Sequence, residues 1–455
     1  MVHTTPNAIA ACVARIVHGT PALWSNPSLW IGFACTIAWP WCLNSVFPQS
    51  APTAQGSLVF LVFGVTGLGI ALGARRGHAL SNRTVLLWGG ALYLGASLWY
   101  ALSLLAPATS RELYGPGVHL LIALSGGGQA LFFVRWIGAL STMEPRSTIV
   151  LVAASAILGA AILLVVGLLP PFACAFVPLL LGLGSIACFA HAVASPSFDA
   201  HRSPCSTDRR PSGVPWKLIA TAFLPGLAFG LQQNLYGHGY YGALAWVIFG
   251  AGGFAVAAVI SLVCALTLRM NFNRMIYQCS YVAMALGCVL GTLWGPVGEA
   301  GYGIFAVGYR LFDILLWSLG AFLIYTHELE PDWFAGICVG SSLLGRFVGF
   351  SPLPGLLGAL ASPHVALTLS LTCFALLTAA LFLENRNNTF EAWGLKRPDD
   401  GVLEKGDIHR ACTQLSSAWR LTPREQEILE LAVRGVSRRS LANELCNPSR
   451  RSKPT

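Results

Sequence analysis

Long runs of apolar residues recur along most of this chain and constrain its fold more than any other feature. Each run reaches about 18 residues or more, which is the length a helix needs to cross the hydrocarbon core of a bilayer. Hydrophobic residues make up 55% of the chain and charged residues only 10%, against about 25% charged in soluble domains. We therefore expect an all-α, polytopic membrane helical bundle. The twelve runs lie near 28–47, 56–74, 84–106, 116–136, 148–169, 172–192, 217–236, 243–267, 275–295, 302–326, 334–357 and 363–384.

Basic residues in the linkers predict the orientation of this bundle. With the N-terminus inside, the outer linkers hold only Arg111. This asymmetry follows the positive-inside rule, so we expect both termini on the cytoplasmic side of the cell membrane. The inner linkers hold Arg75, Arg76, Arg83, Arg146, Arg202, Arg209, Arg210, Lys217, Arg269 and Arg274.

One inner linker departs from this pattern. The segment 326–333 carries Glu328, Glu330 and Asp332, and the sequence alone offers no explanation for them. Acidic residues bear weakly on orientation, so the predicted topology is kept. Arg135 and Glu299 are expected at the membrane interfaces.

The apolar runs divide into two sets of six. A cytoplasmic N-terminus (1–26) precedes helices one to six (27–192), and a polar linker (193–216) leads to helices seven to twelve (217–384). This layout resembles that of the major facilitator superfamily. The resemblance lies in hydropathy, because the family's signature after helix two places an Asp where this chain has Gly73.

Glycine pairs four residues apart predict close helix packing inside the bundle, because Gly lets two helix backbones approach. Three such pairs are Gly226 with Gly230, Gly287 with Gly291, and Gly336 with Gly340.

The polar C-terminal part begins with an expected linker (385–420) and continues with helix signals. Thr422 is a good N-cap, and Glu425 three residues later completes a capping box. Gly435 suits the end of this helix, and Ser437 can cap a second one. Two short helices joined by a Gly turn predict the start of a helix-turn-helix.

This segment resembles the LuxR-type DNA-binding domain of bacterial transcription regulators. The family pattern is L-T-x-R-E-x-E-V-L, then Leu and Ala positions, G-x-S, a polar triplet and I-A-x-x-L. The resemblance implies that residues 421–455 form a DNA-binding domain that acts in a homodimer. The alternative is an ordinary amphipathic helical hairpin. The matching residues are Leu421, Thr422, Arg424, Glu425, Glu427, Ile428, Leu429, Leu431, Gly435, Ser437, Leu441, Ala442 and Leu445.

The segment departs from the family where the recognition helix should begin. The family continues with I-S-x-x-T-V-K-x-H, but this chain places Pro448 and Pro454 there, and proline opposes a helix. We therefore expect an incomplete domain whose DNA binding is weakened or lost. Residues suited to phosphate contact remain, although the last six residues equally suit a solvated tail beside anionic lipid. The candidate phosphate contacts are Arg434, Ser437, Arg438, Arg439, Arg450, Arg451 and Lys453.

Charged residues inside the predicted membrane helices mark a candidate site, because charge in the bilayer is costly. Arg310 and Asp313 stand three apart on one helical face and can pair, whereas Arg346 is left needing a partner. Either these residues hold a small ligand, with an anionic carboxylate on the arginines, or they tie helices together or line water. The polar residues expected to support the ligand pocket are Gln129, Gln232 and Gln233.

No nucleophile–base array, phosphate loop or metal-ligand spacing occurs, so we expect no cofactor, no metal and no enzyme activity. Our first interpretation is a membrane-embedded transcriptional regulator that senses a small molecule through its membrane domain. The second is a major-facilitator-like secondary transporter with a vestigial tail. The third is a gene product that has lost DNA activity.

Overall fold

A computed structural model describes most of the chain as two compact units. The membrane unit spans residues 1–206 with 214–395, and the C-terminal unit spans 207–213 with 396–455. The described residues are 21–45, 54–105, 111–194, 214–236, 243–268, 270–293, 296–327, 329–351, 353–354, 365–385, 388, 412–413, 415–417, 419 and 421–433.

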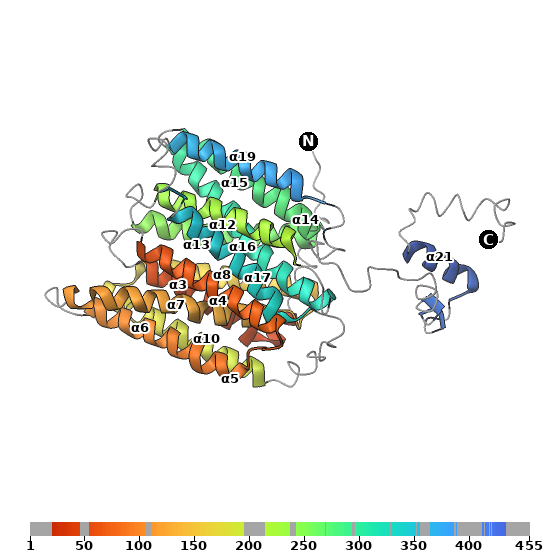
Figure 1. Ribbon diagram of the computed structural model, residues 1–455, viewed down its shortest axis with the longest axis horizontal. Coiled ribbons are helices and arrows are strands. Elements are labelled where there is room, and N and C mark those ends of the chain that lie inside the picture. Colours follow the sequence, from red (N-terminus) through yellow and green to blue (C-terminus); the bar gives the residue numbers. More distant parts are fainter. Residues whose placement is uncertain are drawn as a thin grey trace. The chain divides into compact units, whose positions relative to one another are not determined.

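Helices occupy each of the twelve predicted spans, so the polytopic helical prediction is confirmed (Figure 1). The first half contains a short α2 (Pro21–Ser25), then α3 (Pro27–Ser45), α4 (Ala54–Arg75), α5 (Asn82–Thr84), η1 (Val85–Gly89), α6 (Gly90–Leu105), α7 (Arg111–Leu140), α8 (Pro145–Leu168), α9 (Pro171–Cys174) and α10 (Val177–Ala194). The second half contains α12 (Trp216–Tyr236), α13 (Ala243–Leu262), η4 (Val263–Thr267), α14 (Phe272–Arg274), η5 (Met275–Ser280), α15 (Tyr281–Gly291), α16 (Pro296–His327), α17 (Pro331–Phe350) and α19 (Val365–Leu383).

The outer surface of this bundle is suited to lipid. Seven of the described helical stretches are long and apolar enough to cross a membrane. Large apolar side chains also point outward, among them Leu168 and Phe382, each 83% exposed. A soluble protein rarely leaves so many large apolar groups in water, whereas hydrocarbon chains solvate them at no cost. The exposed residues on α8, α10 and α19 include Leu164, Val165, Leu168, Leu180, Leu183, Phe374, Leu381 and Phe382.

The two halves meet mainly through two helix pairs, α4 against α17 and α8 against α13, with further contacts of α7 to α17 and of α16 to α7 and α8. At the first pair, a Cβ on Gly336 would lie 2.6 Å from the carbonyl oxygen of Gly67, so only glycine permits this approach. Within the second half, α17 also packs on α12, where Gly226 meets the carbonyl of Ser342. The predicted role of these glycines in helix packing agrees with this geometry.

The acidic linker before α17 has a structural explanation that the sequence did not provide. Asp332 is 1% exposed and pairs with Arg135 of α7, with 2.7 Å between Oδ1 and Nη1. The backbone N–H of Leu80 donates to Asp332 Oδ2 at 2.9 Å, and Arg135 also donates to Asn82. Arg135 is therefore buried in an ion pair between the two halves, and its expected place at a membrane interface stays a prediction.

Glu330 has a separate role at the start of the same helix. Its Oε2 accepts a hydrogen bond from the N–H of Trp333 at 2.6 Å, which caps the N-terminus of α17. Glu328 lies outside the described residues. Asp332 thus forms a buried ion pair between the two halves, and Glu330 caps a helix.

The C-terminal unit contains α21 (Pro423–Val433), which begins as the capping box predicts. The N–H and the hydroxyl of Thr422 each donate to Glu425 Oε2 at 2.8 Å, and Thr422 Oγ1 accepts from the N–H of Glu425. The Thr422 backbone N–H, and then its hydroxyl, hold the pKa of Glu425 below its ordinary value. The predicted second helix and all the candidate phosphate contacts, Arg434, Ser437, Arg438, Arg439, Arg450, Arg451 and Lys453, lie outside the described residues.

Candidate ligand site

Two neighbouring helices of the second half position the charged side chains inside the membrane unit. Arg310 and Asp313 stand one turn apart on α16, so they share a face of that helix. Arg346 stands on α17, next to Gly345, whose missing side chain lets α17 lie directly against the backbone of Phe223 on α12. Close helix packing therefore sets the position of Arg346.

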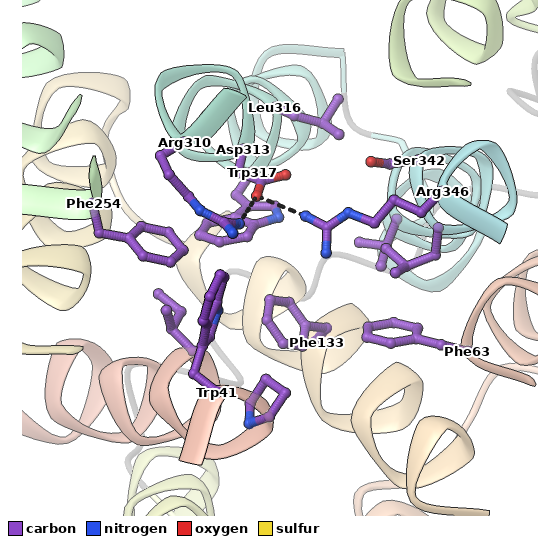
Figure 2. A pocket seen from close by; sticks show the side chains of 14 residues that line it. Trp41, Phe63, Phe133, Phe254, Arg310, Asp313, Leu316, Trp317, Ser342 and Arg346 are labelled. Atoms are coloured by element: carbon purple, nitrogen blue, oxygen red, sulfur yellow. Dashed lines mark hydrogen bonds and ion pairs between the residues drawn. The ribbon is translucent and has the colours of Figure 1, made fainter. Parts of the chain in front are cut away.

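One carboxylate oxygen joins the two arginines. Asp313 Oδ2 accepts a hydrogen bond from Arg310 Nη1 at 3.0 Å and another from Arg346 Nη2 at 3.1 Å. Arg346 Nε also donates to the Tyr309 hydroxyl at 2.7 Å. Figure 2 shows the two guanidinium groups approaching the carboxylate from opposite sides. The side chains of Arg310, Asp313 and Arg346 are only 2%, 6% and 14% exposed.

Aromatic rings enclose both guanidinium groups. The Arg310 guanidinium carbon lies 4.2 Å from the ring centroid of Trp41, 4.6 Å from that of Phe254 and 4.8 Å from that of Phe229. The guanidinium carbon of Arg346 lies 4.7 Å from the ring centroids of both Phe229 and Tyr309. Cation–π attraction at such distances is worth about 2 kcal/mol when the cation is desolvated, so the rings offset part of the burial cost.

A cavity of about 60 Å³ adjoins the charged cluster. Helices of both halves line it, which places it between them. The first half contributes apolar residues of α3, α4 and α7, whereas every charged lining residue comes from α16 or α17. The lining residues are Ile37, Pro40, Trp41, Phe63, Phe133, Phe254, Arg310, Asp313, Leu316, Trp317, Val339, Ser342, Leu343 and Arg346.

The cavity wall carries an unbalanced positive charge. Two arginines and one aspartate leave a formal charge of +1 among its described lining residues. Arg310 Nε is buried and has no hydrogen-bond acceptor among the described residues. An unpaired buried donor on a cation is costly, so this wall is suited to receive an anion.

The structure brings together three of the six predicted pocket residues. Arg310, Asp313 and Arg346 meet at the cavity, whereas the three glutamines do not line it. Gln129 is buried in α7, and Gln232 donates to Cys288 Sγ at 3.5 Å. The Oε1 atoms of Gln232 and Gln233 are buried without a partner among the described residues.

Sequence reasoning did not identify the aromatic residues of the site. Trp41 and Phe63 lie in ordinary apolar spans, where nothing local separates a cavity wall from a lipid-facing or packing residue. Tyr309 is directly next to Arg310 in the sequence, and a hydroxyl beside an intramembrane charge is the one signal that points to it.

Comparison with known proteins identifies the fold. No protein-family model and no curated protein matches the chain. The major facilitator superfamily transporter FucP in its outward conformation aligns with a TM-score of 0.50 at 12% identity, covering 80% of this chain and 99% of that one. A bacterial homologue of the iron transporter ferroportin, in an outward-facing state with soaked iron, aligns with a TM-score of 0.51 at 15% identity. The alignment covers 82% of this chain and 99% of that one. The human organic anion transporter MFSD10 aligns with a TM-score of 0.51 at 14% identity, covering 80% of this chain and 99% of that one.

These identities establish the fold alone: the chain has the membrane helical fold seen in major facilitator superfamily transporters. The prediction of a transcriptional regulator is wrong, because the three solved structures named above, which have this fold, are transporters and no family model matches residues 421–455. DNA as a partner is likewise unsupported, and the expected homodimer rested on the same local resemblance. The findings favour the second interpretation, a transporter.

Proposed function

We propose that this protein is a secondary transporter that carries a small anion across the membrane, without catalysing a reaction. The observation that carries this proposal is the charged cavity enclosed between the two helical halves. A binding site at the interface of two such halves can open to either side when they rock against each other. MFSD10, one of the proteins with this fold, is an organic anion transporter, which supports the same substrate charge.

The positive charge of the wall supports an anion over a cation or a neutral molecule. A buried guanidinium with an unused donor gains an acceptor when a carboxylate or another anion binds. A cation would instead have to overcome the net positive charge of Arg310, Asp313 and Arg346. The fit of the charge to an anion therefore goes beyond what the fold implies.

The orientation in the membrane is part of the proposal. The positive linkers support a cytoplasmic position for both termini in the cell membrane. The two halves then correspond to residues 27–192 and 217–384, joined by the cytoplasmic linker 193–216.

Proteoliposomes that contain the purified full chain test this function. We expect labelled benzoate or lactate to accumulate in exchange for the same unlabelled anion preloaded inside, and we expect Arg310→Gln to abolish this counterflow. The matched control is Arg83→Gln, which removes an exposed arginine of α5. Absence of counterflow for a broad panel of anions, together with uptake of sugars or metal ions, would contradict the proposed substrate charge.

A further inference from the structure

The cavity wall is chemically divided between the two halves of the bundle. All of its charged groups, together with the Ser342 hydroxyl, belong to α16 and α17. The side formed by α3, α4 and α7 presents the apolar or aromatic residues Ile37, Pro40, Trp41, Phe63 and Phe133. Figure 2 shows Trp41, Phe133 and Phe63 on the side of the cavity opposite Asp313.

The apolar side is built from rigid aromatic packing. Phe133 packs against Phe63 and Trp317, with centroid separations of 5.6 Å and 5.5 Å. Both rings are buried: Phe63 is 4% exposed and Phe133 is 6% exposed. The phenyl rings of Phe63 and Phe133 offer no acceptor or donor to a polar ligand group, so a polar group placed against them would lose its hydration without compensation.

The charged side is suited to a single carboxylate. Arginine presents planar N–H donors that match the two oxygens of a carboxylate, and Arg310 Nε is an unused donor of this kind. One negative charge neutralises the formal +1 of the wall. A second negative charge on the same ligand would lie near the Asp313 carboxylate or against the aromatic rings, and both positions are unfavourable.

From this division we infer that the substrate is a small amphipathic monocarboxylate. Its carboxylate binds Arg310 and Arg346, and its aliphatic or aromatic body lies against Trp41, Phe63 and Phe133. The inference rests on the proposed anion transport and adds the valence, the apolar body and the orientation of the ligand. The cavity of about 60 Å³ indicates that the body is short.

Binding to the full chain in detergent tests the ligand class without requiring transport. The probes are butyrate, acetate, butyramide (uncharged, similar in shape) and succinate (two charges), and the signals are isothermal heat and intrinsic fluorescence, to which Trp41 and Trp317 contribute. We expect butyrate to bind about tenfold more tightly than acetate, because two further methylene groups are buried. We expect weaker binding of butyramide and succinate than of butyrate.

Two variants assign the two ends of the ligand. Arg346→Gln is expected to weaken the binding of butyrate and of acetate by the same factor, since both ligands lose a contact to their carboxylate. Phe63→Ala is expected to weaken the binding of butyrate by a clearly larger factor than the binding of acetate, and its remaining acetate binding shows that it folds. Arg83→Gln should bind both probes as the native protein does.

The inference is overturned if butyramide or succinate binds as tightly as butyrate, or if Phe63→Ala weakens acetate and butyrate equally. These results would leave anion transport itself standing. The opposite result, in which butyrate binds with the expected ranking but no anion crosses proteoliposomes, would support the ligand class and contradict the transport function.

Discussion

Asp313 is the residue on which the candidate site depends, because one of its oxygens serves two buried arginines. Its pairing with Arg310 follows from helical spacing and is predictable from the sequence. Its pairing with Arg346 is not, since it depends on how closely α17 approaches α16 across 33 residues of chain. The sequence could show only that one intramembrane arginine lacked a partner.

Replacing Asp313 by Asn should destabilise the protein strongly. The change leaves two buried guanidinium groups without a counter-charge, and breaking a buried ion pair in this way costs about 3–5 kcal/mol. We expect a lower unfolding temperature for the detergent-solubilised variant, partly restored by millimolar butyrate, which supplies the missing negative charge. The control is Glu299→Gln, an exposed acid in the first turn of the same helix. An unchanged unfolding temperature for Asp313→Asn would show that the pairing contributes nothing to stability.

Among the elements, α17 connects the site to the rest of the bundle. Gly336 and Gly340 face α4 of the first half, and Gly345 and Gly349 face α12 of the second half. Glycine spacing in the sequence predicts that a helix packs closely, because small residues drive helix association in lipid. It cannot predict which neighbour each glycine meets, and that choice decides where Arg346 points.

Replacing Gly345 by Ala should therefore disturb the site without touching a charged group. The new Cβ would clash with the backbone carbonyl of Phe223, which cannot move aside as a flexible side chain would, so α17 and α12 must separate. We expect reduced thermal stability and weaker butyrate binding, measured on the same purified sample. The control is Gly69→Ala on α4, where an added Cβ would meet nothing within 4 Å. Equal behaviour of the two variants would refute the packing argument.

The ion pair of Arg135 with Asp332 links α7 of the first half to α17 of the second half. The two residues are 197 positions apart, so no local pattern could reveal the contact. The sequence showed only the two partners separately: a basic residue near the end of a predicted helix and an acidic linker on the predicted cytoplasmic side.

A double-mutant cycle on this pair should show strong coupling. Arg135→Ala and Asp332→Ala each leave one charge buried and unpaired, at a cost of about 3–5 kcal/mol, whereas the double variant removes both charges. We expect the double variant to be destabilised by clearly less than the sum of the two single changes, as measured by thermal unfolding in detergent. Glu330→Ala is the control, because it removes the helix cap of α17, a loss worth about 1 kcal/mol, and leaves both partners of the ion pair in place. Additive effects of the two alanine substitutions would mean that the contact is not energetically coupled.

At the scale of the whole molecule, the membrane fold was predictable because lipid imposes it. Every span must satisfy its backbone hydrogen bonds internally and be long enough to cross, and both demands are visible as apolar runs. The function was misjudged for the opposite reason. The resemblance over Leu421–Leu445 is local, whereas the fold of the twelve helices rests on packing between segments far apart in the sequence. Transporters that are only 12–15% identical to this chain share its fold, so the fold does not depend on a sequence motif that they have in common.

The cavity and residues 396–455 belong to different compact units. Every described residue that lines the cavity belongs to the membrane unit, and so do the helices through which the two halves meet. Deleting residues 396–455 should therefore leave anion counterflow in proteoliposomes at the rate of the full chain, with the same dependence on Arg310. Arg310→Gln in the shortened chain provides the inactive reference. Loss of counterflow in a shortened chain that still binds butyrate would show instead that the C-terminal unit takes part in the transport cycle.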